Sequence, residues 1–245
     1  MTQIDLNADL AEGGPCDKAL LTLVSSANIS CGAHAGTERD ILHAIDCALR
    51  SQVRIGAHPS YPDRESMGRR SMKLPTAQLR DSIHSQLNRL SRLVQASGGS
   101  LQHVKAHGAL YNDAAQDPEL ADELCAWIKE FDPTLAVVGL AGSYMKEAAR
   151  RHGQRFYAEA FVDRAYQPDG KLLPRDQKGA VLHNAEHAIM QTLSIIQKGT
   201  VLSHCGQQVT LSADTFCIHG DNPEALQLAQ SLVDRLTRSG IRVCQ

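Results

Sequence analysis

The segment Ile4-Asp5-Leu6-Asn7-Ala8-Asp9-Leu10 (IDLNADL) contains the pattern that decides the fold. Apolar and polar residues alternate, and a period of two places Asp5, Asn7 and Asp9 on one face of a β-strand. A strand of a parallel sheet normally reads as a continuous run of Val, Ile and Leu, because both of its faces are buried. The segment therefore predicts a strand with a polar face, and buried groups of this kind need partners, a metal ion or a wet cavity.

Strand-like segments recur along the chain, with helical patterns between them. Seven strands are predicted, over residues 3–9, 23–30, 53–58, 101–107, 135–140, 154–159 and 215–219. The predicted helices begin after Thr37, after Pro75 and at Pro118, cover residues 142–151 and 178–198, and begin again at Pro223. Strict alternation of strand and helix predicts a parallel sheet with helices outside, and seven strands without a dinucleotide-binding fingerprint favour a (β/α) barrel. We expect a single domain over residues 1–245, with a β-hairpin inserted near residues 200–212.

Ionisable side chains recur on one face of at least five predicted strands, close to their carboxyl ends. They are Asp9 in the first strand, His58 in the third, His103, Lys105 and His107 in the fourth, Glu159 in the sixth, and His219 and Asp221 at the seventh. The carboxyl ends of barrel strands meet at one rim, and this rim carries the catalytic residues of barrel enzymes. The pattern therefore predicts one shared polar site.

Two loops that follow strands extend this site. Residues 28–36 (NISCGAHAG) carry His34 among small residues, which allow a ligand to approach the backbone closely. Residues 58–64 (HPSYPDR) carry Arg64, and Arg70 follows at the end of an Arg-Arg pair. Guanidinium groups recognise carboxylates and phosphates, so Arg64 and Arg70 are candidate anion-binding residues. The Arg-Arg pair fits a solvated charge run equally well.

The same cluster contains the ligand types of a divalent metal site. The metal candidates are Asp9, His34, His58 and His107. The chain contains no H-E-x-x-H motif, so the sequence signal for a metal is weak. General acid–base catalysis by these groups needs no ion, and both interpretations stay open.

Composition excludes several classes of function. The 245 residues contain 25 Lys and Arg against 27 Asp and Glu, a net charge of −2, which gives no general attraction to nucleic acid or anionic membrane. No apolar run is long enough to span a bilayer, and the N-terminus lacks a signal-peptide pattern, so we expect a cytoplasmic protein.

The seven cysteines include no C-x-x-C pair. The phosphate-binding pattern G-x-x-x-x-G-K-[ST] is also absent, so an ATP-consuming reaction would need help from another chain.

Nine short motifs, in order along nearly the whole chain, carry a resemblance to a known family. They are IDLNADL (4–10), ANISCGAHAG (27–36), IGAHPSYPDR (55–64), GRR (68–70), HVKAHGALYN (103–112), GLAGS (139–143), EAFVDR (159–164), PR (174–175) and CIHGDNP (217–223). With these motifs the chain resembles the LamB/YcsF family. It departs from the family pattern at Ala8, Ser30, Met67 and Ala106, and none of these departures removes an ionisable group.

The resemblance implies a (β/α)7-type barrel related to polysaccharide deacetylases. It also implies the ATP-dependent hydrolytic opening of 5-oxo-L-proline (pyroglutamate) to L-glutamate by a multisubunit 5-oxoprolinase, in which this chain would act with subunits B and C. ATP would then be bound with or by the partner subunits. The resemblance leaves open whether a divalent metal takes part and whether the chain forms a homo-oligomer.

We combine the resemblance with the polar face to assign expected roles. Asp9, His58 and His107 would activate water and move protons, and Lys105 and His219 would stabilise negative charge. The expected substrate-binding residues are Asn7, His34, Arg64, Arg70, Glu159 and Asp221. Two other functions stay open, namely a metal-dependent amidohydrolase or carbohydrate deacetylase that acts alone, and a non-catalytic subunit that binds the substrate for its partners.

Overall fold

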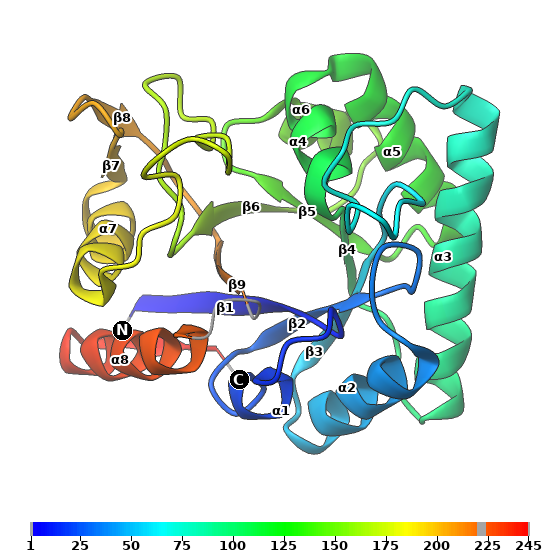
Figure 1. Ribbon diagram of the computed structural model, residues 1–245, viewed down its shortest axis with the longest axis horizontal. Helices are drawn as coiled ribbons and strands as arrows, with labels where there is room; N and C mark the ends of the chain where they lie inside the picture. The colour runs from blue at the N-terminus through cyan, green and yellow to red at the C-terminus, as the bar shows by residue number, and fades with distance from the viewer. Residues whose placement is uncertain (1, 220–223, 245) are drawn as a thin grey trace.

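Seven parallel strands close into a barrel in the computed structural model, which describes residues 2–219 and 224–244. The barrel strands are β1 (Thr2–Leu10), β2 (Ser26–Ser30), β3 (Arg54–His58), β4 (His103–Lys105), β5 (Ala136–Leu140), β6 (Phe156–Phe161) and β9 (Thr215–His219). β1 closes the ring by pairing with β2 on one side and β9 on the other (Figure 1). The predicted (β/α)7-type barrel is therefore confirmed.

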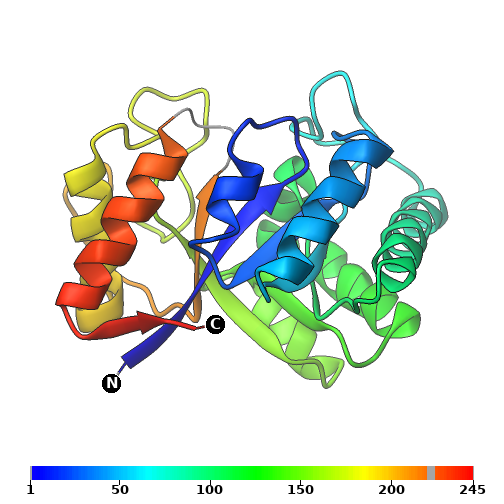
Figure 2. The same ribbon diagram turned by 90° about the horizontal axis from the view of Figure 1, so that it is seen from below.

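Three short strands of the described residues lie outside this ring. β10 (Ile241–Val243) pairs in parallel with the start of β1, where Thr2 lies opposite Ile241. The two ends of the described chain therefore lie side by side (Figure 2). β7 (Thr200–Leu202) and β8 (Gln208–Thr210) form an antiparallel pair before β9. The sequence analysis does not predict β10, because three residues are too few to show a period.

Helices surround the barrel, as Figures 1 and 2 show. They are α1 (Asp17–Leu20), α2 (Glu38–Arg50), α3 (Thr76–Ala96), α4 (Gly108–Gln116), α5 (Pro118–Phe131), α6 (Tyr144–Arg151), α7 (Ala185–Lys198) and α8 (Ala225–Arg238). In α2, a capping box between Thr37 and Asp40 begins the helix, and Ile41 and Ile45 are buried on its inner face. None of the described helices is long and apolar enough to cross a membrane.

Several predicted boundaries are wrong. The helix predicted over residues 178–198 begins only at Ala185, capped by the side chain of Asn184. The preceding residues instead bond to the segment after β6, where the Leu182 N–H donates to the Asp163 carbonyl. The strand predicted over residues 101–107 ends at Lys105, and the unpredicted helix α4 begins at Gly108. The predicted helix start at Pro223 lies outside the described residues.

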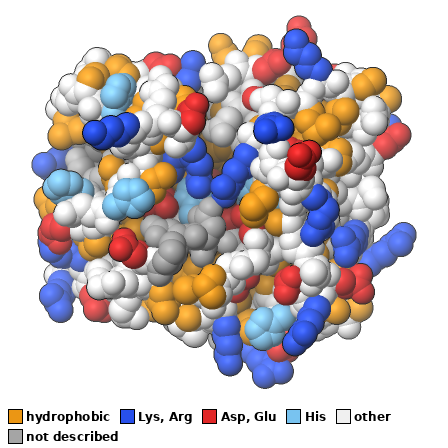
Figure 3. Space-filling view, viewed as in Figure 1, with side chains coloured by type: hydrophobic (Ala, Val, Ile, Leu, Met, Phe, Trp, Pro, Cys, Tyr) orange, Lys and Arg blue, Asp and Glu red, His pale blue; other side chains and the backbone are white. Residues whose placement is uncertain are grey.

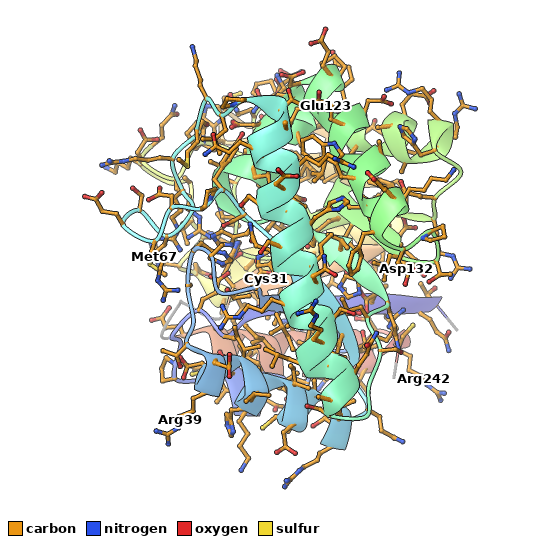
Figure 4. The ribbon with its side chains drawn as sticks, turned by 90° about the vertical axis from the view of Figure 1, so that its right-hand side faces the viewer. Cys31, Arg39, Met67, Glu123, Asp132 and Arg242 are labelled. Carbon is orange, nitrogen blue, oxygen red and sulfur yellow. The ribbon has the colours of Figure 1, made fainter. Side chains whose placement is uncertain are left out.

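Parallel strands give the barrel two chemically different ends. The loops that follow the strands gather at one end, and Met67 lies there in Figure 4, whereas Asp132 and Arg242 lie at the opposite end. The N-terminal end contains a cavity of about 480 Å³ whose lining includes Asp5, Arg54 and His103. Because the predicted chemistry lies at the carboxyl ends of the strands, this cavity is not the candidate active site.

The carboxylate of Asp5 ties four strands together at this N-terminal end. Asp5 Oδ1 accepts hydrogen bonds from the hydroxyls of Ser25 at 2.5 Å and Ser26 at 2.8 Å, and from Arg54 Nη2 at 2.6 Å. Asp5 Oδ2 accepts a bond from the hydroxyl of Thr215 at 2.6 Å. These donors lie on β2, β3 and β9 or directly beside them. One side chain of β1 therefore fixes the position of three other strands.

We predict that Asp5→Ala lowers the free energy of unfolding by about 2–3 kcal/mol, because it removes four hydrogen bonds to a carboxylate. Arg54 is partly exposed, so its ion pair contributes only a small part of this loss. Urea denaturation at pH 7 measures the change. The matched control is Asp46→Ala, which removes an exposed carboxylate paired with Arg50. Equal losses in the two variants would contradict the role given to Asp5.

Candidate functional site

Seven of the predicted site residues meet inside the mouth formed by the carboxyl ends of the strands. They are Asn7, Asp9, His34, His58, Lys105, His107 and Glu159, and each is at most 8% exposed. Figure 3 looks onto this mouth, where basic side chains and histidine gather around a central hollow. These seven polar side chains therefore form one buried cluster.

Lys105 occupies the middle of the cluster. Its Nζ lies 2.9 Å from Asp9 Oδ1, 2.8 Å from Glu159 Oε1 and 3.2 Å from Cys217 Sγ. Burial disfavours the charged ammonium, but the negative charge of Asp9 and its neighbours outweighs burial and raises the pKa of Lys105 well above its usual value. Lys105 therefore remains a cation that joins side chains of β1, β6 and β9.

Asp9 links this ammonium to an imidazole. Its Oδ1 also accepts a hydrogen bond from Asn28 Nδ2 at 2.8 Å, and its Oδ2 lies 3.4 Å from His58 Nε2. Burial would raise the pKa of Asp9, but the charges of His58 and Lys105 outweigh it and hold this pKa well below its usual value. The same pairing raises the pKa of His58 against the effect of burial. Asp9 is thus an ionised acceptor beside a basic imidazole.

Three histidines surround Glu12, a residue that the sequence analysis does not select. Glu12 Oε1 lies 2.9 Å from His107 Nδ1, 3.1 Å from His34 Nε2 and 3.6 Å from His58 Nε2. Burial opposes ionisation of Glu12, but the adjacent imidazoles of His107 and His34 hold its pKa far below the usual value. Burial lowers the pKa of His34 to about 4, so its imidazole is neutral near pH 7.

The sequence feature that could have identified Glu12 is its position two residues after β1, because functional side chains collect at this rim of the barrel. Its direction depends on Ala11, whose φ of 61° lies in the left-handed region. A period-two pattern does not reveal such a turn. Tyr111, also unselected, lies one helical turn after His107 and donates a hydrogen bond to Glu159 Oε2 at 2.7 Å.

Glu159 Oε1 lacks a hydrogen bond among the described residues although it is buried. It lies 2.8 Å from Lys105 Nζ in a buried ion pair. Asn7 is fully engaged, because its Nδ2 donates to Thr215 Oγ1 at 2.6 Å and its Oδ1 accepts from Asn28 Nδ2 at 2.8 Å. Glu159 Oε1 therefore has the ammonium of Lys105 as its partner and can accept one further hydrogen bond.

His219 forms the edge of the site on β9. Its Nδ1 lies 2.9 Å from Asp163 Oδ1, and its ring stacks on Phe161 with ring centres 5.3 Å apart. Burial would raise the pKa of Asp163, but His219 outweighs burial and lowers it. His219 is therefore held in a defined orientation next to Asp9 and Cys217, with which it forms a group of closely spaced ligand atoms.

Two other predicted site residues do not join this cluster, and a third lies outside the described residues. The exposed Arg64 donates hydrogen bonds to the carbonyls of Gly32 at 2.7 Å and Gly36 at 3.1 Å, so its guanidinium braces a loop. Arg70 is exposed, and no hydrogen bond or ion pair links it to the cluster within the part of the chain that the structure describes. Asp221 lies outside the described residues.

Two groups of side chains have the spacing that metal ligands require. One consists of Glu12, His34 and His107, and the other of Asp9, Cys217 and His219. In the second group, the ammonium of Lys105 contacts both Asp9 and Cys217 and already supplies a positive charge. Glu12 and His107 of the first group adjoin His58, and these three residues are the better candidates for holding a cation.

The closed parallel barrel, with ionisable groups at its C-terminal mouth, has the architecture of α/β-barrel enzymes. The model of the LamB/YcsF family matches residues 4–245, and the chain belongs to this family. A relative from Erwinia tasmaniensis, named as the A subunit of 5-oxoprolinase, is 48% identical over 241 residues, which cover 98% of each chain.

Solved structures agree with this assignment. The lactam utilization protein from Thermus thermophilus is 38% identical, with a TM-score of 0.91 over 99% of each chain. A cellobiose-phosphate cleavage protein from Enterococcus faecalis, described as putative, covers 100% of this chain and 97% of its own, with 14% identity and a TM-score of 0.62. A structure described as T48 deacetylase with substrate covers 99% of this chain and 87% of its own, with 13% identity and a TM-score of 0.51. The last two show the likeness of fold alone.

We predict that Lys105→Met lowers the free energy of unfolding at pH 7 by about 3–5 kcal/mol, because it leaves two buried carboxylates without their cation. Adding Glu159→Gln to this variant should restore a large part of the loss, since it removes one of the two unpaired charges. Urea denaturation of the two single variants and the double variant measures the coupling. Lys146→Met, an exposed change on α6, is the matched control. Purely additive losses would contradict the ion pair.

We predict that His103 makes the fold sensitive to acid. Burial lowers its pKa to about 4, against an ordinary value of 6.5. The unfolded chain therefore binds this proton first, and stability that is complete above pH 6.5 is lost toward pH 4 at about 1.4 kcal/mol per pH unit. His103→Gln should flatten the fall in the free energy of unfolding between pH 7 and pH 4.5. Parallel profiles for the two proteins would contradict this account.

Proposed function

We propose that this chain is the A subunit of an ATP-dependent 5-oxoprolinase, which hydrolyses the ring amide of 5-oxo-L-proline to give L-glutamate. Support comes from the Erwinia tasmaniensis relative of that name, which matches this chain over nearly its full length. The name of the Thermus thermophilus relative points to the same class of substrate. The observation that carries the proposal is the buried group of Asp9, Lys105 and His58, which provides the charges that amide hydrolysis requires.

The proposed reaction explains the need for ATP and for partner chains. A five-membered ring amide is stabilised by resonance, and phosphorylation of its oxygen would convert that oxygen into a leaving group. A first water can then attack the ring carbon, the carbon–nitrogen bond breaks and the ring nitrogen takes up a proton, which leaves an acyl phosphate. A second water hydrolyses this acyl phosphate to the carboxylate of glutamate and free phosphate. Because the sequence lacks the usual phosphate-binding loop, we assign ATP binding and phosphorylation to subunits B and C.

The buried cluster provides the groups for the hydrolytic half of this reaction. His58, with its raised pKa, accepts a proton from water, and the ionised Asp9 stabilises the imidazolium that results. Lys105 stays charged and stabilises the negative oxygen of the intermediate. These three residues therefore supply a base and an oxyanion partner within one hydrogen-bonded group.

The remaining residues of the cluster bind and orient the substrate. Glu159 Oε1 lacks a hydrogen bond and can accept the N–H of the ring. His107 takes part in proton transfer, and His219 stabilises charge from the edge of the mouth. His34 holds Glu12 in place, and Asn7 accepts a hydrogen bond from Asn28, which also donates to Asp9. Arg70 and Asp221 stay predicted substrate-binding residues, whereas we leave Arg64 out because two backbone carbonyls occupy its guanidinium.

A reconstituted assay tests this function. We predict that the purified chain forms glutamate from 5-oxoproline only when subunits B and C and ATP are all present. Asp9→Asn and His58→Gln should each lower this turnover by about 10²–10⁴-fold, because each removes part of the base.

Asp46→Asn, which changes an exposed carboxylate remote from the cluster, is the matched control and should keep full turnover. Circular dichroism checks that each variant is folded. Turnover by the chain alone without ATP would instead favour an amidohydrolase that acts by itself. Unchanged turnover in folded Asp9→Asn and His58→Gln variants would favour a protein that only binds the substrate for its partners.

A further inference from the structure

Two imidazole rings in the mouth of the barrel direct acceptor nitrogens at each other. His58 Nδ1 lies 2.8 Å from the Lys105 carbonyl, and His107 Nε2 lies 2.9 Å from the Met67 carbonyl. A carbonyl oxygen can only accept, so both of these outer nitrogens carry hydrogen. In the neutral rings, the inner nitrogens His58 Nε2 and His107 Nδ1 are then both lone-pair acceptors, although they lie only 3.0 Å apart. This contact is repulsive unless a positive charge lies between the rings.

Carboxylate oxygens converge on the same point. Glu12 Oε1 lies 2.9 Å from His107 Nδ1 and 3.6 Å from His58 Nε2, and Asp9 Oδ2 lies 3.4 Å from His58 Nε2. Nitrogen and oxygen ligands bind transition metals at about 2.0–2.2 Å, which places neighbouring ligand atoms roughly 3–3.5 Å from one another. The separations in the cluster therefore match the edges of a coordination shell.

The net negative charge of the buried cluster also favours the binding of a cation. The carboxyl groups of Asp9, Glu12 and Glu159 lie together with one ammonium group, that of Lys105. In their ionised forms these groups carry a net charge of −2. Buried charge of this size is costly without compensation, and one divalent ion would neutralise it.

His34 plays a different part from the other two histidines. Its ring stacks on His107 with ring centres 3.9 Å apart and an angle of 9° between the planes. The lone pairs of two parallel rings cannot both lie in plane toward one ion, so His34 does not share an ion with His107. Its Nε2 instead lies 3.1 Å from Glu12 Oε1, where it can donate a hydrogen bond that positions the carboxylate.

We propose that Glu12, His58 and His107, with Asp9 as a fourth ligand, bind one divalent transition-metal ion, and that His34 positions Glu12. Imidazole and carboxylate ligands suit zinc and its neighbours in the first transition row. The backbone acceptors at His58 and His107 fix their tautomers, as partners of metal-bound histidines do. This inference rests on the ligand atoms alone, and it is an alternative to the proton-accepting role given above to His58 and His107, because an ion would occupy the same nitrogens.

Metal binding is measured on the complete chain, without partners, substrate or ATP. The protein is treated with a chelator, and Zn²⁺ is then added and followed by calorimetry and by metal analysis after gel filtration. We expect one tightly bound ion per chain and a rise in the melting temperature with Zn²⁺ concentration. Co²⁺ should give the visible absorption bands of an ion held by nitrogen and oxygen ligands. If the wild-type protein retains no ion and its melting temperature does not rise, the site does not exist.

Variants decide whether the ion lies in this cluster. Glu12→Gln and His107→Gln should each weaken Zn²⁺ binding by at least about 100-fold, and His34→Gln by about 10-fold, because it removes only a positioning contact. The matched control is His152→Gln, which changes a histidine paired with Asp122 away from the mouth and should keep wild-type affinity. Circular dichroism confirms folding, and the Co²⁺ spectrum of the wild-type protein provides a test that needs no variant.

Two results would overturn the proposal. Wild-type affinity in both folded ligand variants would place the bound ion elsewhere on the protein. A shared proton between His58 and His107, seen by nuclear magnetic resonance in wild-type protein saturated with Zn²⁺, would show that an imidazolium supplies the positive charge instead.

Discussion

The buried ammonium group of Lys105 places the strictest constraint on this protein, because it is only 2% exposed inside a parallel barrel. A charge in that position persists only beside groups that compensate it, and Asp9 on β1 and Glu159 on β6 do so across the barrel interior. The polar alternation of β1 follows from this requirement, since an apolar inner face would leave the ammonium unpaired. The chemistry proposed for the mouth depends on the same cation remaining charged.

The pairing at Lys105 belongs to a polar chain that runs along the barrel axis. At the N-terminal end, Thr215 donates to Asp5 and accepts from Asn7. Asn28 then donates both to Asn7 and to Asp9, which brings the chain to the ion pair at the mouth. Structural and functional groups therefore share one hydrogen-bonded network, so a substitution at the N-terminal end can disturb the cluster at the mouth.

Much of this arrangement can be predicted from the sequence, because periodicity carries the necessary information. A period of two identifies the inward side chains, and the parallel topology brings Asp9, His58 and Lys105 to one end. The conformations of the loops cannot be predicted from periodicity. Glu12 enters the site only through the left-handed turn at Ala11, and residues 178–184 bond to the chain after β6 rather than continuing a helix. In both regions the backbone follows tertiary contacts, which local pattern does not encode.

The strained backbone at Met67 fixes the position of the ring hydrogen of His107. It is a non-glycine residue with a φ of 52°, a conformation that stores roughly 1–3 kcal/mol, and its carbonyl accepts the Nε2 hydrogen of His107. Relaxation to an ordinary conformation would lower the energy of this loop but move the carbonyl away, and the imidazole could then adopt its other tautomer. A substitution at Met67 that relieved this strain would raise thermostability but would no longer fix the tautomer of His107. Substitutions that adapt the protein to heat are therefore restricted at this position.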